Sequence, residues 1–230
     1  MKTIGIIGGM SWESSAEYYR LINERVKARL GPAHSADLVM YSLDFEPIAR
    51  LELQERWEEF AVVLVDAAKR LERAGAEFIL LASNTAHKVA DNVQAAIETP
   101  LLHIADDAAE AIAAAGIQRV GLLGTEFVMQ QDFYRHRLRN RGIDALLPGE
   151  KQRTCVHDVI YNELCAGKLL DDSKAKLLAI ILDLQRAGAQ AVVLACTELP
   201  LLIRPEDTPV RLFDTMAIHV EKAVTLALGT

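Results

Sequence analysis

Short apolar runs alternate along the chain with longer amphipathic stretches. Continuous apolar runs of this kind predict parallel strands that are buried on both faces. The stretches between them repeat apolar residues every three or four positions and stop at Gly or Pro, which predicts helices. Ser11 or Ser14 is the expected N-cap of the first helix, and Ser14 with Glu17 has capping-box spacing. In the first half we expect strands at 3–7, 38–43, 78–82 and 101–104, with helices from the cap to about 31 and at 54–74, 88–97 and 106–115.

The second half opens like the first. The run RVGLLGT at 119–125 repeats the pattern of TIGIIGG at 3–9. We expect strands at 143–147 and 191–195 and helices near 126–140, 152–166 and 171–187. A Thr-Pro pair precedes the last apolar run of each half, at 99–100 and 208–209, and an Asp-started helix follows it. The chain therefore reads as an internal duplication.

One stretch shows the duplication most clearly. Residues 73–87 read RAGAEFILLASNTAH and residues 186–200 read RAGAQAVVLACTELP. Aligned on the Arg, Ser83 falls on Cys196 and His87 falls on Pro200. In each half, the residues just after the apolar run lie at the carboxyl end of a predicted buried strand, where open α/β sheets bind ligands.

Strand–helix alternation with Gly at the turns predicts an α/β fold with parallel sheets covered on both faces. The duplication predicts two similar doubly wound lobes related by a pseudo-twofold. We expect residues 1–115 with 213–230 in the first lobe and 116–212 in the second. Their strand ends would then face each other across an active site in the cleft between lobes.

Composition excludes several classes of protein. The 230 residues carry a net charge of −7, with a pI near 5.4, which argues against a nucleic-acid partner because phosphate binding favours a basic face. No apolar run approaches the roughly 18 residues of a membrane span, and the start lacks a signal-peptide pattern. Three cysteines at no metal-like spacing fit a reducing cytosol better than a disulfide framework. We expect a cytoplasmic protein without a membrane partner.

Cys196 is the strongest candidate for chemistry. Free Cys is often simply buried, but this one follows a predicted strand directly and precedes Thr197, Glu198 and a possible helix start at Leu199. A helix N-terminus lowers a thiol pKa, and a nearby carboxylate can shuttle the proton. We therefore interpret Cys196 as functional, whereas Cys155 and Cys165 lie inside helical patterns and read as structural.

The remaining candidates are weaker on their own. Ser83, Asn84 and Thr85 could cap a helix, although the duplication places them opposite the thiol. His87 and His219 read as ordinary histidines. The pattern Gly5-x-x-Gly8-Gly9 is not a dinucleotide fingerprint, no Lys has a Schiff-base context, and no His/Cys/carboxylate set has zinc spacing. The chemistry therefore looks free of cofactors and metals.

These motifs resemble those of one family over the whole chain. The opening MKTIGIIGGMSWESSAEYYRLIN, ASNTAH at 82–87 and ACTELP at 195–200 resemble the aspartate/glutamate racemase superfamily, in particular the bacterial, broad-specificity aspartate/glutamate type. The resemblance implies a cofactor-independent racemase that acts on L-aspartate or L-glutamate by two bases on opposite faces of the α-carbon. It also implies a homodimer.

The resemblance further implies roles for single residues. Cys196 would remove the α-proton of the L-enantiomer, with Glu198 tuning it, and Ser83 would stand on the opposite face. Amides and hydroxyls of one set of residues would hold the α-carboxylate, and a second set would line the pocket or bind the side-chain carboxylate. The first set is Ser83, Asn84, Thr85, Thr125 and Thr197; the second is Met10, the stretch 50–54 with Glu52 or Gln54, and Lys168.

Ser83 departs from the family pattern, which has Cys there. A hydroxyl is a far weaker acid than a thiol with a pKa near 8.5, so Ser83 is a poor proton partner. Three explanations are open: a natural variant that acts mainly from the L side, an engineered Cys→Ser change, or different chemistry. The alternatives to a racemase are a one-cysteine decarboxylase or isomerase of the same superfamily and a non-catalytic protein that binds dicarboxylic amino acids.

Overall fold

The computed structural model describes residues 1–229, which form two compact units. Unit 1 comprises residues 1–104 together with the segment that starts at His219, and unit 2 is Ala105–Ile218. Two helices cross these limits along the chain: α5 (Ile104–Ala114) and α11 (Thr215–Leu228). Each unit has its own sheet and its own apolar core, so each is described by itself.

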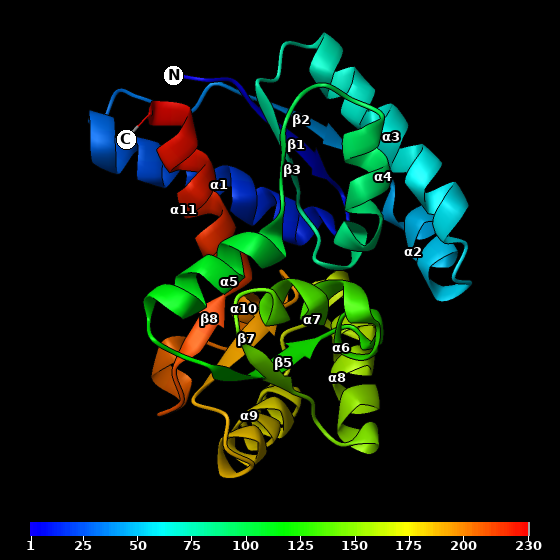
Figure 1. Ribbon diagram of the computed structural model, residues 1–230, viewed down its shortest axis with the longest axis vertical. Coiled ribbons are helices and arrows are strands. Elements are labelled where there is room, and N and C mark those ends of the chain that lie inside the picture. Colours follow the sequence, from blue (N-terminus) through cyan, green and yellow to red (C-terminus); the bar gives the residue numbers. More distant parts are fainter. Residues whose placement is uncertain (230) are drawn as a thin grey trace. The chain divides into compact units, whose positions relative to one another are not determined.

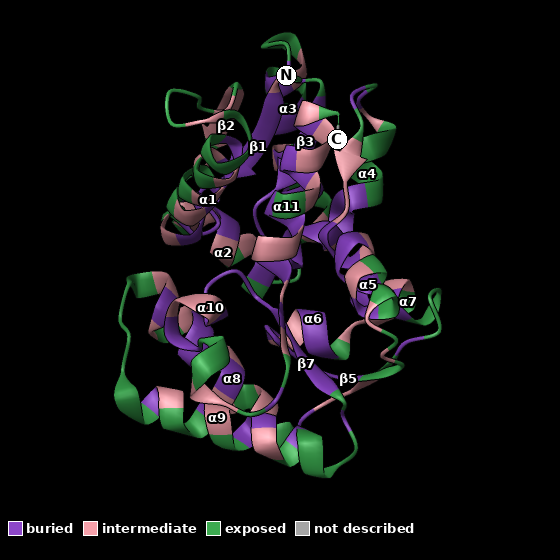
Figure 2. Ribbon diagram, turned by 90° about the vertical axis from the view of Figure 1, so that its left-hand side faces the viewer, coloured by how far each residue is buried: buried purple, intermediate pink, exposed green. Residues whose placement is uncertain are grey.

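Unit 1 contains a four-stranded parallel sheet with the strand order β2-β1-β3-β4 (Figure 1). The central strands β1 and β3 are buried along their whole length, as Figure 2 shows. The elements of this unit before α5 are β1 (Ile4–Gly8), α1 (Trp12–Leu30), β2 (Leu38–Ser42), α2 (Phe45–Leu53), α3 (Trp57–Arg73), β3 (Phe78–Leu81), the 3-10 helix η1 (Thr85–Val89), α4 (Ala90–Ala95) and β4 (Leu101–Leu102).

Unit 2 repeats this order with a second parallel sheet, β6-β5-β7-β8. In both sheets the first strand of the unit is central and pairs with the second and third. The α/β fold with two parallel sheets, predicted from the alternation and the duplication, is confirmed. The elements are β5 (Arg119–Gly124), α6 (Glu126–Gln130), α7 (Asp132–Arg139), β6 (Asp144–Leu146), α8 (Glu150–Asn162), η2 (Leu164–Ala166), α9 (Asp171–Arg186), β7 (Ala191–Ala195), α10 (Leu199–Leu202), η3 (Pro205–Asp207) and β8 (Leu212–Asp214).

Helices cover both faces of the unit 1 sheet. Ile7, Ile79 and Leu81 pack with α2, α3 and α4 in one apolar cluster. Because neighbouring strand residues point to opposite faces, the fully buried Ile6 and Leu80 lie on the other side, where Figure 1 places α1 and α11. Burial on both faces explains why these strands read as continuous apolar runs rather than as alternating ones.

The core of unit 2 is built on the same plan. Val192 and Leu194 of β7 pack against the apolar sides of α8 and α9. On α7, Tyr134 and Leu138 are fully buried, and this helix is joined to α5 by an ion pair between Arg137 and Asp106 at 2.8 Å. The strand ends of this sheet are thus fixed by a core independent of that of unit 1.

Two predicted helices differ from those in the structure. The expected helix at 54–74 begins only at Trp57, because Glu55 takes a positive φ of 52° and breaks the helical path. The preceding α2 (Phe45–Leu53) was not predicted. Its Pro47 lies in the first turn, where the missing N–H costs no hydrogen bond. The expected helix at 126–140 is interrupted at Gln131, which is extended.

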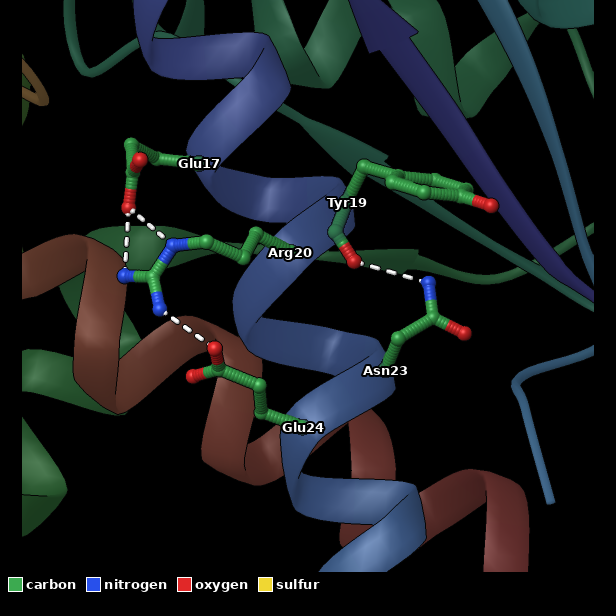
Figure 3. Close-up of polar contacts among 5 residues, drawn as sticks. All are labelled: Glu17, Tyr19, Arg20, Asn23 and Glu24. Carbon is green, nitrogen blue, oxygen red and sulfur yellow. Dashed lines mark hydrogen bonds and ion pairs between the residues drawn. The ribbon is translucent and has the colours of Figure 1, made fainter. Parts of the chain in front are cut away.

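The capping-box prediction at Ser14 was wrong. Helix α1 begins at Trp12 after Ser11, so Ser14 lies inside the helix, where its hydroxyl donates to the Ser11 carbonyl. Further along α1, Arg20 forms ion pairs with Glu17 and Glu24 on the exposed face (Figure 3).

Among residues 1–229, no helix combines the length and the apolar character needed to cross a membrane.

Candidate functional site

A glycine lies at the carboxyl end of the first strand of each unit, where the chain passes close to a neighbouring backbone. Gly9 has a φ of +84°, and a Cβ there would lie 2.1 Å from the Leu43 carbonyl oxygen. A Cβ at Gly124 would lie 2.6 Å from the Ala195 carbonyl oxygen. Both positions therefore require glycine. The next residues, Met10 and Thr125, are 4 % and 5 % exposed.

The Ser83 strand end lies in unit 1, beside the end of β1. Strands β1 and β3 pair in parallel with Ile7 opposite Leu81, so Met10 and Ser83 leave neighbouring strands at the same edge of the sheet. The amide of Ala86 donates to Ser83 Oγ at 3.3 Å, which is the capping contact that Ser favours. Ser83, Asn84 and Thr85 are all buried.

His87 connects this strand end to two other elements. Its Nδ1 lies 2.8 Å from the Ser83 carbonyl oxygen, and its Nε2 accepts the amide of Ile104 at the start of α5. The centroid of its ring lies 4.5 Å from that of His103, in a tilted arrangement, and 5.9 Å from that of His219, edge to face. Tyr18 of α1 hydrogen-bonds to His219 Nδ1 at 3.0 Å. No sequence pattern indicated this buried cluster, because its members lie far apart in the chain.

The Cys196 strand end lies in unit 2, directly after β7. The Cys196 thiol donates to Glu198 Oε2 at 3.0 Å, and the Thr197 hydroxyl donates to the same oxygen at 2.9 Å. All three residues are 5 % exposed or less. A thiol and a hydroxyl thus fix one carboxylate oxygen, and that carboxylate is placed to accept the thiol proton.

The predicted lowering of the Cys196 pKa was wrong. Burial raises the pKa of the thiol well above its usual value, and the charge of Glu198 raises it further. A helix does begin at Leu199, but α10 has only four residues, and the field of so short a helix does not overcome desolvation and a neighbouring anion. Cys196 is therefore a neutral thiol at rest, paired with a proton acceptor.

Thr125 follows β5, the neighbour of β7. The two strands pair with Gly124 opposite Ala195, so Thr125 and Cys196 leave adjacent strands at one edge of the sheet. The Thr125 hydroxyl accepts the amide of Val128 and caps α6. The next amide, that of Glu126, donates to His157 Nδ1 at 3.3 Å, and burial lowers the pKa of His157.

The other predicted site residues differ in their exposure. Glu52 is 3 % exposed, whereas Gln54 is exposed. A surface groove of about 330 Å³ runs along α2 and contains Gln54 but not Glu52. In unit 2, Lys168 is exposed in the turn after η2, where its amide donates to the Glu163 carbonyl. The groove is lined by Glu46, Ala49, Arg50, Leu53 and Gln54.

The described part of the chain contains no group of three or more His, Cys, Asp or Glu side chains that could hold a metal ion. The side chains that are able to take part in proton transfer are the Cys196 thiol and the Glu198 carboxylate after β7 and the Ser83 hydroxyl after β3. They occupy equivalent positions in two equivalent sheets. The Cys196 thiol and the Glu198 carboxylate are close enough to exchange a proton.

Comparison with known proteins identifies the family of the chain. Residues 7–223 match the Asp/Glu/Hydantoin racemase family. The broad specificity amino-acid racemase RacX of Bacillus subtilis is 24% identical over 232 residues, covering 98% of each chain. A crystal structure from Yersinia pestis, named as a candidate Asp/Glu racemase, has a TM-score of 0.90 and 46% identity over 99% of this chain and 100% of that one.

An aspartate racemase homologue from Pyrococcus horikoshii OT3 superimposes with a TM-score of 0.85 and 37% identity, over 99% of this chain and 100% of that one. These relatives share the fold over nearly the full length, including both strand ends. The family match spans both units and includes Ser83 and Cys196. The chain belongs to the Asp/Glu/Hydantoin racemase family.

Proposed function

We propose that the protein is an amino-acid racemase that acts on L-aspartate or L-glutamate without a cofactor, with Cys196 as the principal base. The observation that carries this proposal is the buried contact of 3.0 Å between the Cys196 thiol and Glu198. Within a racemase family, a thiol paired with a proton acceptor at a strand end is suited to α-proton transfer.

The proton balance follows from the resting state. Because the pKa of Cys196 is raised, the thiol must first pass its proton to Glu198. The thiolate then takes the α-proton and leaves a carbanion, which the amides and hydroxyls of Asn84, Thr85, Thr125 and Thr197 would stabilise through the α-carboxylate. Inversion requires a proton from the opposite face, which we assign to Ser83, resupplied by solvent.

Ser83 makes the proposed reaction asymmetric. Its hydroxyl accepts the Ala86 amide and is a much weaker acid than a thiol. We expect the α-proton of the L-enantiomer to exchange faster than its configuration inverts. Met10, Glu52 or Gln54, and Lys168 are the proposed substrate contacts outside the two strand ends, and we propose a cytoplasmic homodimer.

The test is α-hydrogen exchange in D2O, with chirality followed in parallel, for each enantiomer of Asp and Glu. Exchange from the L-enantiomers with little inversion is expected. Ser83→Cys should increase inversion on the order of a hundredfold, the range of general acid–base effects. Absence of exchange in both proteins would contradict the proposal.

One alternative has a specific observation in its favour. A single thiol, with Ser83 in place of the second, is enough to protonate a carbanion formed by loss of CO2. Release of CO2 from an arylmalonate-type acid, with no exchange of amino-acid α-protons, would select this one-cysteine decarboxylase or isomerase. Binding of dicarboxylic amino acids without any exchange would select a non-catalytic binding protein.

A further inference from the structure

The Ser83 strand end is held by an imidazole whose protonation state the hydrogen bonds determine. His87 is 2 % exposed. Its Nε2 accepts the Ile104 amide at 3.2 Å, so that nitrogen carries no proton. Its Nδ1 lies 2.8 Å from the Ser83 carbonyl oxygen, which can only accept. The ring is therefore neutral, with its single proton on Nδ1.

We infer that His87 is a positioning residue for the proton transfer at Ser83, an inference that rests on the proposed racemase function. A peptide unit is planar, and its C=O and N–H point in opposite directions. By holding the Ser83 carbonyl, the imidazole also sets the direction of the Asn84 amide. This one hydrogen bond thus orients the backbone of Ser83, whose hydroxyl is the proposed proton donor. It also orients the Asn84 amide, which is proposed to hold the α-carboxylate.

The surroundings of His87 keep its ring in place. The rings of His103 and His219 pack on it. The far side of the ring is anchored to the first amide of α5 through Ile104. A side chain locked in this way holds its partner within the small tolerance that proton transfer requires.

The equivalent position in unit 2 cannot act in the same way. Pro200 occupies it, and Pro has no side-chain donor. There the Thr215 hydroxyl donates to the Leu194 carbonyl at 2.9 Å, inside β7 and before Cys196. The imidazole contact is thus particular to the Ser83 end, and its loss should affect only the proton delivered there.

The experiment uses the Ser83→Cys protein, in which inversion is fast enough to measure. His87→Leu removes both ring contacts at similar volume. His87→Asn keeps a donor near the position of Nδ1, and His87→Gln places a polar group near the position of Nε2 instead. Each is compared with Tyr18→Phe, which removes the hydrogen bond to His219 and leaves both hydrogen-bonding nitrogens of His87 in place.

The readout is the ratio of inversion to α-deuterium exchange from the L-enantiomer. His87→Leu and His87→Gln should lower this ratio tenfold to about a hundredfold, the cost of misplacing a reacting group. His87→Asn should recover most of it, and Tyr18→Phe should leave it unchanged while lowering the thermal midpoint. If His87→Leu does not fold, the comparison of His87→Asn with His87→Gln tests the role of the Nδ1 contact.

A second readout does not need activity. The Ser83→Cys change introduces a thiol whose alkylation by iodoacetamide can be followed by peptide mass spectrometry. Its alkylation rate should rise when His87→Leu or His87→Gln frees the loop, while that of Cys196 stays the same. Equal loss of inversion and exchange, or an unchanged alkylation rate of the introduced thiol, would overturn the role of His87. Absence of exchange in the Ser83→Cys parent would instead count against the proposed function.

Discussion

The Ser83 and Cys196 strand ends have equivalent places in their sheets, but their side chains differ in chemistry. Ser83 and Cys196 occupy the same place after the third strand of their sheets, yet the residues two positions later differ: Thr85 in unit 1 and Glu198 in unit 2. Of these two, only Glu198 provides a carboxylate that can accept a proton, at 3.0 Å from the sulfur. The Ser83 oxygen instead accepts a backbone amide. The duplication thus repeats the position of Ser83 and Cys196 after their strands, whereas the neighbouring side chains determine whether a proton acceptor lies beside them.

The largest effect should come from removing each reacting atom in turn. Cys196→Ala is expected to lower α-proton exchange from the L-enantiomer about a thousandfold, within the range for loss of a general base. Ser83→Ala should change the same exchange less than about tenfold, because it acts on the other face. Loss of the α-proton signal in D2O, followed by NMR, measures both. Equal losses in the two variants would break the comparison.

Glu198→Gln should lower exchange about a hundredfold, because the thiol loses its proton acceptor. The same change should lower the pKa of Cys196, since the charge of Glu198 helps to raise it. The iodoacetamide rate of Cys196 against pH measures this pKa. Thr197→Val, which removes the second donor to the carboxylate, is the milder control. A higher thiol pKa in Glu198→Gln would contradict the assignment.

The titration of the buried His219 should make the stability of the fold depend on pH. Burial lowers the pKa of His219 to about 3, and the neighbouring His87 contributes to this lowering. A hydrogen bond with the backbone of Leu102 raises the pKa but does not compensate. An unfolded histidine titrates near 6.5, so between these values the unfolded state binds the extra proton. Stability from this group is present above pH 6.5 and falls by about 1.4 kcal/mol per pH unit as the pH drops towards 3.

Urea unfolding between pH 7 and pH 4 measures this slope. The double change Tyr18→Phe with His219→Phe removes both polar partners and should flatten it by about 1 kcal/mol per pH unit. His34→Gln, at an exposed position, should leave the slope as it is. An unaltered slope in the double variant would show that His219 is already protonated in the fold.

The smallest effect is expected on the outer face of α1, away from the proposed proton transfer. Arg20 pairs with Glu17 and Glu24, but half of its side chain is exposed. Arg20→Ala should lower the free energy of unfolding by about 0.5 kcal/mol, and less in high salt. Exchange and inversion should both be unchanged; a change in either would show that the comparison of strand ends is incomplete.

The sequence predicted the fold better than the site. Continuous apolar runs identified the buried strands, and β7 has the predicted limits 191–195. Helix breaks at Glu55 and Gln131 depend on single backbone conformations that no pattern of apolar residues encodes.

At the site, the spacing of Cys196 and Glu198 indicated a thiol next to a carboxylate. The pKa of that thiol depends on its burial, which the sequence does not give. The contact of His87 with Ile104 joins residues 17 positions apart through two loops. It could not be read from local patterns. The roles of the site residues stay predictions that the experiments above test.

The cluster beneath Ser83 also has a consequence for biosynthesis. Tyr18 and its partner His219 are separated by 201 positions, and all of unit 2 lies between them. During synthesis, which adds about 5–20 residues per second, the imidazole that supports His87 is therefore made only after the whole of unit 2. The Ser83 end cannot gain its full set of contacts before that point.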